Sequence, residues 1–202
     1  MIDTFLFDMG NVLVHFSHPL MCQQIADVCG SSAEEIRRLL FDQGWENEFE
    51  RGELTEAQFQ TRLENHFQRQ INLPALVLAA SDIFTLNAPM VPILQSLRRQ
   101  GKRLVLLSNT SISHIEFVRR EFDVLSFFDD FVLSYEVGAM KPQPAIFESA
   151  LNKILCPPER CFYTDDIPAY IEAALRHGLQ AEVFTTAASL EGQLARRGVV
   201  LS

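Results

Sequence analysis

The feature that most constrains the fold of this chain is a set of three short, mainly apolar runs, each followed directly by polar residues. In chain order they are Phe5–Phe7 before Asp8, Arg103–Leu107 before Ser108 and Asn109, and Cys161–Thr164 before Asp165 and Asp166. An apolar run without alternation predicts a strand covered on both faces, as in a parallel sheet with helices on either side. Open α/β sheets bind their ligands at the carboxyl ends of such strands. We therefore expect these polar side chains to meet at one edge of a sheet.

From about residue 89 onward, the sequence alternates between helical and strand patterns. Two further strands are predicted, at Phe131–Leu133 and Ala181–Phe184, and a helix is predicted to begin at Pro144, since proline is favoured at the first helical position. This alternation predicts parallel strands joined by right-handed crossovers. With the strand that precedes Asp8, the chain is expected to form a three-layer α/β fold around a Rossmann-like parallel sheet of about five strands.

After the first strand, roughly residues 18 to 88 read as helical, with no clear strand. Two capping boxes, Ser32–Glu35 and Thr55–Gln58, each predict the start of a helix. We therefore predict a core domain made of residues 1–16 and 89–202. Residues 17–88 are expected to form a helical cap, inserted into the core and standing over the carboxyl edge of its sheet.

Charge and hydropathy narrow the range of functions. The chain has 17 basic and 26 acidic residues, a net charge of −9, which argues against nucleic acid or an anionic membrane as a partner. No apolar run is long enough to cross a membrane and the first residues lack the basic region of a signal peptide, so a cytoplasmic location is expected. A phosphorylated substrate would need a local positive charge or a metal ion. The sequence leaves the oligomeric state open.

The polar residues at the strand ends, together with Lys141, form a set that suits phosphoryl transfer. The carboxylates of Asp8, Asp165 and Asp166 would repel one another unless a cation neutralised them. Oxygen ligands without histidine or cysteine favour Mg²⁺. The Lys141 ammonium and the Ser108 hydroxyl would then contact the oxygens of a small phosphorylated substrate. These are the components of nucleophilic transfer through an aspartyl-phosphate. The structural alternatives are a turn at Asp8, a helix cap at Asp166 and a solvated loop lysine.

Four sequence motifs, taken together, resemble those of the haloacid dehalogenase-like hydrolase superfamily, in the same order and over nearly the whole chain. They are Phe5–Val12, Leu104–Thr110, Gly138–Phe147 and Phe162–Asp166. The helical insert is similar to the small cap of this family. Within it, Trp45–Leu54 (WENEFERGEL) resembles a cap helix and turn of the small sugar-phosphate phosphatases, and the chain as a whole resembles their glucose-1-phosphatase-type members.

The resemblance implies a role for each matching residue. Asp8 would be the nucleophile and a ligand of Mg²⁺, and the Gly10 backbone carbonyl would be a second ligand. Ser108 and the Asn109 backbone would hold phosphoryl oxygens. Lys141 would counter the charge on the phosphate and on the nucleophile.

The remaining implied roles belong to the aspartate pair and the cap. Asp166 would bind the metal directly, with Asp165 beside it as a further ligand or a supporting residue. Trp45 is a candidate substrate contact, although an aromatic residue in a helical cap more often belongs to its core. Three acidic residues near it are expected to form a solvated face: Glu46, Glu48 and Glu50.

Two positions depart from the family pattern. The phosphatases of this family usually carry an acidic Asp two residues after the nucleophile, where it protonates the leaving alcohol, and this chain has Gly10 there. The loss should matter less for an acidic leaving oxygen, as in a sugar 1-phosphate, and His15 is another conceivable acid. Tyr170 stands where the family usually has Asn, in a loop that supports the metal site.

The resulting expectation is an Mg²⁺-dependent phosphatase acting on a small phosphorylated metabolite, such as a sugar phosphate. One alternative is a 2-haloacid dehalogenase, in which the same Asp8 attacks carbon without a metal. The retained pair Asp165 and Asp166 argues against that chemistry. A second alternative is a catalytically inactive module for regulation or interaction, which Gly10 and Tyr170 would permit.

Overall fold

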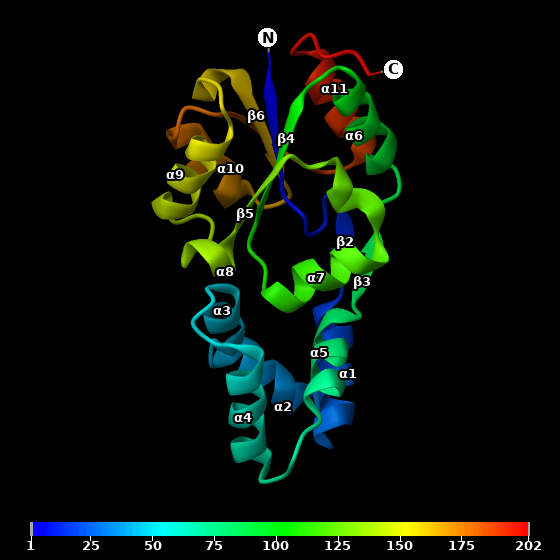
Figure 1. Ribbon diagram of the computed structural model, residues 1–202, viewed down its shortest axis with the longest axis vertical. Helices are drawn as coiled ribbons and strands as arrows, with labels where there is room; N and C mark the ends of the chain where they lie inside the picture. Colours follow the sequence, from blue (N-terminus) through cyan, green and yellow to red (C-terminus); the bar gives the residue numbers. More distant parts are fainter. Residues whose placement is uncertain (1, 202) are drawn as a thin grey trace.

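The computed structural model describes residues 2–201, and a five-stranded parallel sheet lies at the centre of its larger part (Figure 1). The strands are β1 (Thr4–Phe7), β4 (Arg103–Ser108), β5 (Asp130–Leu133), β6 (Cys161–Asp165) and β7 (Gln180–Val183), in the spatial order β5-β4-β1-β6-β7. β1 is central, because it pairs with β4 on one side and with β6 on the other. The chain winds outward from β1 in both directions, which makes the carboxyl end of β1 a topological switch point. The predicted α/β fold class is confirmed.

Helices cover both faces of this sheet, since alternate residues of a strand point to opposite sides (Figure 1). Phe5 and Phe7 of β1 lie in the apolar cluster that includes residues of α6 (Met90–Arg99) and α11 (Ala187–Ala195). Leu6 lies in a second cluster, with residues of α9 (Pro144–Lys153) and α10 (Pro168–Arg176). Further elements of this part are α7 (Ile112–Glu121), the 3₁₀ helix η2 (Asp123–Phe127), α8 (Ser134–Val137) and the 3₁₀ helix η3 (Pro158–Arg160).

A separate group of helices stands beyond the carboxyl edge of the sheet, in the lower half of Figure 1. They are α1 (His18–Cys29), α2 (Ala33–Arg37), the π-helix η1 (Arg38–Asp42), α3 (Trp45–Glu50), α4 (Glu56–Phe67) and α5 (Leu73–Ser81). The capping box at Thr55 is complete, whereas at Ser32 only one half forms, because the Glu35 carboxylate binds Arg38 and His66 instead. Within residues 2–201, no helix has both the length and the apolar character needed to span a bilayer.

A two-stranded antiparallel ribbon joins the two groups of elements. Strand β2 (Val14–Phe16) pairs with β3 (Phe84–Leu86), so that Val14 lies opposite Leu86. The expectation that no strand precedes residue 89 after the first one is therefore wrong. The error has a physical cause, since three residues are too short to show alternation and β3 depends on its distant partner. We propose that this ribbon connects the core and cap domains predicted from the sequence.

Candidate active site

The ammonium group of Lys141 lies at the centre of the polar edge of the sheet. Asp8 follows the last residue of β1, and Asp165 is the last residue of β6. The Lys141 Nζ donates to Asp8 Oδ1 at 2.7 Å, to Asp165 Oδ2 at 2.6 Å and to the Leu107 carbonyl at 3.0 Å. The structure thus brings together side chains from three segments that the sequence places far apart.

All three of these charged groups are buried. Asp8, Lys141 and Asp165 expose 7%, 3% and 0% of their surface, so the surrounding dielectric is low. Burial raises the pKa of Asp8 to about 7, against the opposing effect of the Lys141 charge. Burial alone would lower the pKa of Lys141, but the two carboxylates raise it, and the group stays an ammonium ion. One ammonium faces more than one carboxylate, which leaves the site short of positive charge.

A third carboxylate completes an acidic cluster. Oxygen atoms of Asp8, Asp165 and Asp166 lie within 4.8 Å of one another. Asp165 is fully engaged, because its Oδ1 accepts from the Ile167 N–H at 2.8 Å and its Oδ2 accepts from Lys141 and from the Tyr163 hydroxyl. Oδ2 of Asp166 accepts one hydrogen bond, from the Asn11 side chain at 3.0 Å. Asp8 and Asp166 therefore have more oxygen atoms free for a ligand than Asp165 has.

In the turn after Asp8, a side chain at position 10 would require the Phe16 ring to shift. A Cβ atom built on Gly10 would lie 2.8 Å from Cε1 of the Phe16 ring, which real Cβ atoms essentially never do. The backbone bonds that close the turn use the carbonyls of Met9 and Val14. Among the described residues, no hydrogen-bond donor is bonded to the Gly10 carbonyl, which is therefore available to a ligand.

Asn109 and Tyr170 also contact Lys141, through its backbone and its ammonium group respectively. Oδ1 of Asn109 accepts from the Lys141 N–H at 2.7 Å, and its Nδ2 donates to the Lys141 carbonyl at 3.1 Å. The same Nδ2 lies 3.3 Å from the Tyr170 hydroxyl, and the Tyr170 ring centroid is 5.1 Å from the Lys141 Nζ. Ser108, at the end of β4, is buried, and its hydroxyl donates to the Asn109 carbonyl at 3.2 Å. The Tyr at position 170 thus contacts the lysine and its asparagine partner.

Two glutamates of α3 line the pocket beside this site, together with Gly10, Asn109 and Thr110. Burial raises the pKa of Glu46 to about 8 and that of Glu50 to about 7. The prediction of a solvated face is wrong for both residues, which are half-buried on one side of α3. The sequence does indicate that Glu46 and Glu50 share one face of a helix, because they are four residues apart. Glu48 lies elsewhere on α3 and pairs with Arg62 at 2.8 Å.

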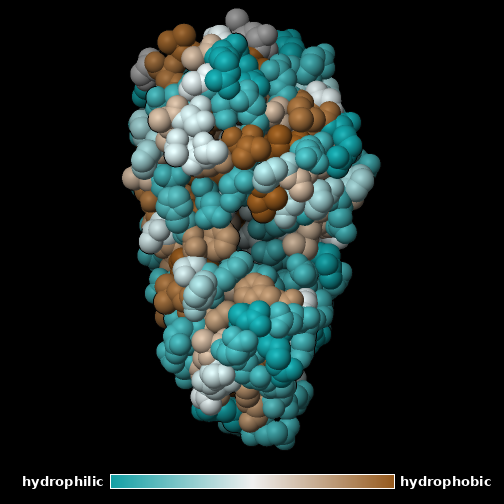
Figure 2. Space-filling view, turned by 180° about the vertical axis from the view of Figure 1, so that it is seen from behind, coloured by the Kyte–Doolittle hydropathy of each residue, from teal (hydrophilic) through white to brown (hydrophobic). Residues whose placement is uncertain are grey.

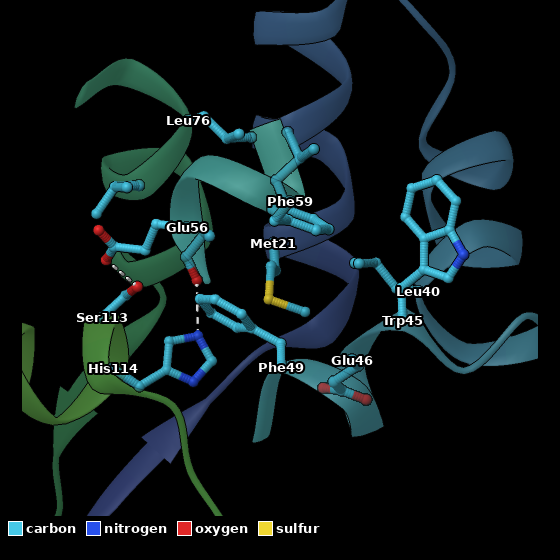
Figure 3. Close-up of a pocket in the computed structure, with 13 residues that line it drawn as sticks. Met21, Leu40, Trp45, Glu46, Phe49, Glu56, Phe59, Leu76, Ser113 and His114 are labelled. Carbon is cyan, nitrogen blue, oxygen red and sulfur yellow. Dashed lines mark hydrogen bonds between the residues drawn. The ribbon is translucent and has the colours of Figure 1, made fainter. Parts of the chain in front are cut away.

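Trp45 lies in a different part of the cap, where an apolar cavity opens between the helices (Figure 3). Its ring contacts Phe59 edge to face and carries the Arg62 guanidinium at 5.2 Å. The structure does not bring Trp45 into the pocket with Gly10 and Asn109. His15 is exposed on β2, away from the acidic cluster's pocket.

Comparisons with known proteins bear on this arrangement. A model of the haloacid dehalogenase-like hydrolase family matches residues 2–178. A family enzyme from Bacteroides thetaiotaomicron, solved in complex with magnesium and inorganic phosphate, has a TM-score of 0.82 and 22% identity, covering 92% of this chain and 96% of that chain. A predicted HAD-like family hydrolase from Porphyromonas gingivalis has a TM-score of 0.82 and 24% identity, covering 98% of each chain. A 2-haloacid dehalogenase from Pseudomonas syringae pv. Tomato DC3000 has a TM-score of 0.70 and 18% identity, covering 98% of this chain and 100% of that chain.

The structural similarities establish the fold, and phosphate-binding and dehalogenating relatives share it. The family match is independent of them and extends over most of the chain. It confirms the resemblance that the four sequence motifs indicated. The chain belongs to the haloacid dehalogenase-like hydrolase family.

Proposed function

We propose that the protein is an Mg²⁺-dependent phosphatase of a small phosphorylated metabolite, acting through an aspartyl-phosphate. The observation that carries this proposal is the placement of Asp8 at the switch point, bonded to Lys141 and within 4.8 Å of the other two aspartates. The buried Asp8 can act as a nucleophile beside Lys141. The excess of carboxylates over basic groups suits a divalent cation, which in turn would allow a negatively charged substrate to bind.

The donor set at this edge fits Mg²⁺, since it consists of oxygen atoms alone. Asp8, Asp166 and the free carbonyl of Gly10 would hold the ion, which when bound would neutralise charge on the phosphoryl group. Because both oxygens of Asp165 are already hydrogen-bonded, we assign Asp165 to the positioning of Lys141. The relative from Bacteroides thetaiotaomicron, which was solved with magnesium and inorganic phosphate, supports the proposal of Mg²⁺ as the ion.

The protein side chains then account for both chemical steps. A carboxylate oxygen of Asp8 attacks phosphorus, and the bond between phosphorus and the leaving alcohol breaks. The Ser108 hydroxyl and the Asn109 backbone hold the phosphoryl oxygens, and the Lys141 ammonium, which is bonded to Asp8, offsets the charge as it develops. Water then attacks the phosphorus of the aspartyl-phosphate, releasing phosphate and restoring the Asp8 carboxylate. Tyr170 supports this set through Lys141 and Asn109, which counts against an inactive module.

The pocket lining favours an uncharged leaving group. Glu46 and Glu50 line the pocket beside Gly10 and Asn109, where the leaving group would lie, and among the described residues that line it there is no lysine or arginine. A second phosphate or a carboxylate on the substrate would find no cationic partner there, whereas hydroxyl groups can donate to glutamate oxygens. The cavity volume is only about 50 Å³, which favours a compact substrate. These features support a compact sugar monophosphate, including a sugar 1-phosphate.

The decisive experiment is hydrolysis of p-nitrophenyl phosphate with and without Mg²⁺, by the wild type and by Asp8→Asn. This activated ester needs little acid assistance. We expect metal-dependent turnover that the substitution abolishes, followed by preference for sugar monophosphates over bisphosphates. Metal-independent release of halide from 2-haloacids, without phosphatase activity, would assign the chain to the dehalogenases instead.

A further inference from the structure

The proposed reaction needs a proton donor that the turn after Asp8 does not supply. Gly10 has no side chain, and the Phe16 ring fills the space that a side chain would enter. Phe16 is itself held between neighbouring rings, with centroids 4.9 Å from His18 and 6.3 Å from Phe84. This chain has no acid at position 10, and a side chain there would require the Phe16 ring to shift, so a donor has to reach the leaving oxygen from another element.

The C-terminal end of α3 is fixed directly above the site. The Ser134 hydroxyl donates to the Glu50 carbonyl at 2.6 Å. The same hydroxyl accepts from the Thr110 N–H at 2.9 Å and lies 3.0 Å from the Thr110 carbonyl, and Thr110 follows the residues proposed to bind phosphate. Two residues later, Gly52 approaches the core so closely that a Cβ atom would lie 2.4 Å from the Tyr135 carbonyl oxygen. Glu50 is thus attached to the core through its own backbone.

The side chain of Glu50 is held in the pocket without a partner. It lines the pocket with Gly10 and Asn109, and within residues 2–201 no hydrogen bond or ion pair engages its carboxyl group. Burial raises its pKa to about 7, outweighing the nearby positive charge of Lys141. The other titratable groups around it are Glu46, His18, His114, Tyr170 and Lys141. At neutral pH this carboxyl group can therefore both hold and release a proton.

Two other groups of the pocket are less suited to proton transfer. Glu46 is engaged with His18, whose Nε2 lies 3.3 Å from its Oε1. His114 is engaged with the Ala80 carbonyl through its Nε2 at 3.0 Å, and burial lowers its pKa to about 4. Glu50 is the unpaired carboxyl group of the pocket among the described residues.

We propose that Glu50, carried by the cap, is the catalytic acid and base of this site in place of the absent side chain at position 10; this inference rests on the proposed phosphatase function. As Asp8 forms its bond to phosphorus, the Glu50 carboxyl group gives its proton to the leaving oxygen, and a neutral alcohol departs. The Glu50 carboxylate then takes a proton from the water that attacks the aspartyl-phosphate. This second step yields phosphate and restores both side chains to their starting states.

The test compares Glu50→Gln, Glu46→Gln and Glu48→Gln on a series of phosphate monoesters, from p-nitrophenyl phosphate to simple alkyl phosphates. The measured quantity is kcat/KM, which reports formation of the aspartyl-phosphate and not its hydrolysis. We expect Glu50→Gln to lose roughly 10²–10⁴-fold on alkyl phosphates and less than about tenfold on p-nitrophenyl phosphate. Glu48→Gln, outside the pocket, should match the wild type. The p-nitrophenyl activity of Glu50→Gln also shows that the variant is folded.

A pH profile provides a second readout. For alkyl phosphates, kcat/KM of the wild type should fall as pH rises above about 7, as the Glu50 acid ionises, and this fall should be absent from Glu50→Gln. Equal losses of Glu50→Gln on both kinds of ester, or an unchanged dependence on the leaving group, would overturn the role of Glu50 and leave the phosphatase proposal standing. A selective loss in Glu46→Gln alone would move the role to Glu46. A wild type inactive on every monoester with Mg²⁺ would overturn both proposals.

Discussion

The Asn109 side chain binds the backbone of Lys141 at both of its polar atoms, accepting from the N–H at 2.7 Å and donating to the carbonyl at 3.1 Å. The amide side chain of Asn109 thus satisfies both the N–H and the carbonyl of Lys141, as a neighbouring strand would in a sheet. The relationship fixes where the Lys141 ammonium enters the site. It also explains why position 109 needs a side chain with both a donor and an acceptor.

Replacing Asn109 with Ala should therefore weaken both the fold and the site. The variant leaves the Lys141 backbone groups without their partner, which should lower the free energy of unfolding by about 1–3 kcal/mol. Turnover of p-nitrophenyl phosphate should fall at least roughly tenfold, because Lys141 loses its position. Urea unfolding and steady-state kinetics measure the two effects. Asn65→Ala, on the exposed side of α4, is the control and should change neither. Wild-type stability in Asn109→Ala would contradict the role of these bonds.

Lys141→Met should be more damaging than any loss of a surface lysine. The substitution leaves the buried carboxylates of Asp8 and Asp165 facing each other without a cation, a situation that typically costs about 3–5 kcal/mol. Activity should be lost as well. Lys153→Met removes a partly exposed ion pair with Asp130 and should cost less than about 1 kcal/mol. Denaturant unfolding of the two variants side by side would disprove the prediction if their losses were equal.

Restoring the usual family acid by Gly10→Asp should fail. The new Cβ would collide with the Phe16 ring, and overpacking of this kind typically costs about 1–3 kcal/mol. The variant should be less stable in thermal unfolding and no more active on alkyl phosphates. Adding Phe16→Ala should relieve the collision, so that Asp is tolerated better in the double variant than in the single one. A single variant as stable as the wild type would show that Phe16 moves aside freely.

The stability of the cap should depend on pH through Glu46. Burial raises its pKa to about 8 in the folded protein, from an ordinary value of 4.5. Between these values the folded state keeps a proton that the unfolded state has released, so stability falls as pH rises. At about pH 8, Glu46→Gln should be more stable than the wild type by up to about 4 kcal/mol, and near pH 4.5 the difference should nearly vanish. Thermal unfolding across this range measures the effect. The melting temperature of Glu48→Gln should change with pH as that of the wild type does. The same pH dependence in Glu46→Gln would refute the prediction.

Mg²⁺ should stabilise the folded protein, because a ligand that binds only the folded state adds to the free energy of unfolding. Chelation should lower the melting temperature, and added Mg²⁺ should restore it. Asp166→Asn should abolish this response, whereas Asp27→Asn, at an exposed position of α1, should preserve it. A full response in Asp166→Asn would exclude Asp166 as a ligand.

The sequence predicts β1, β4 and β6 because each is a mainly apolar run, and it predicts β5 and β7 from the alternation of helical and strand patterns. It also places Asp8, Lys141 and Asp165 at one edge, since parallel strands end together. The ribbon β2–β3 escapes prediction because each of its three-residue strands is stable only against the other. The prediction that Glu46 and Glu50 face solvent is wrong because it rests on their charge alone and not on the packing of α3.

Other parts of the site depend on tertiary contacts that no local pattern encodes. Nothing near Phe16 in the sequence indicates that its ring occupies the space beside Gly10. The support that Tyr170 gives to Lys141 likewise arises from packing between α10 and the turn before α9. The effect of the departures from the family motifs at positions 10 and 170 therefore depends on which side chains pack against them in the folded protein.

The ribbon of β2 and β3 also bears on how such a protein can evolve. Because Phe16 lies opposite Phe84, the chain leaves and rejoins the sheet-bearing part at neighbouring points. The helices between these points, in the lower half of Figure 1, form a cassette with adjacent ends. Such a cassette can be lengthened, shortened or exchanged without changing the strand order, so that new substrates can be acquired while the chemistry at the edge of the sheet is inherited intact.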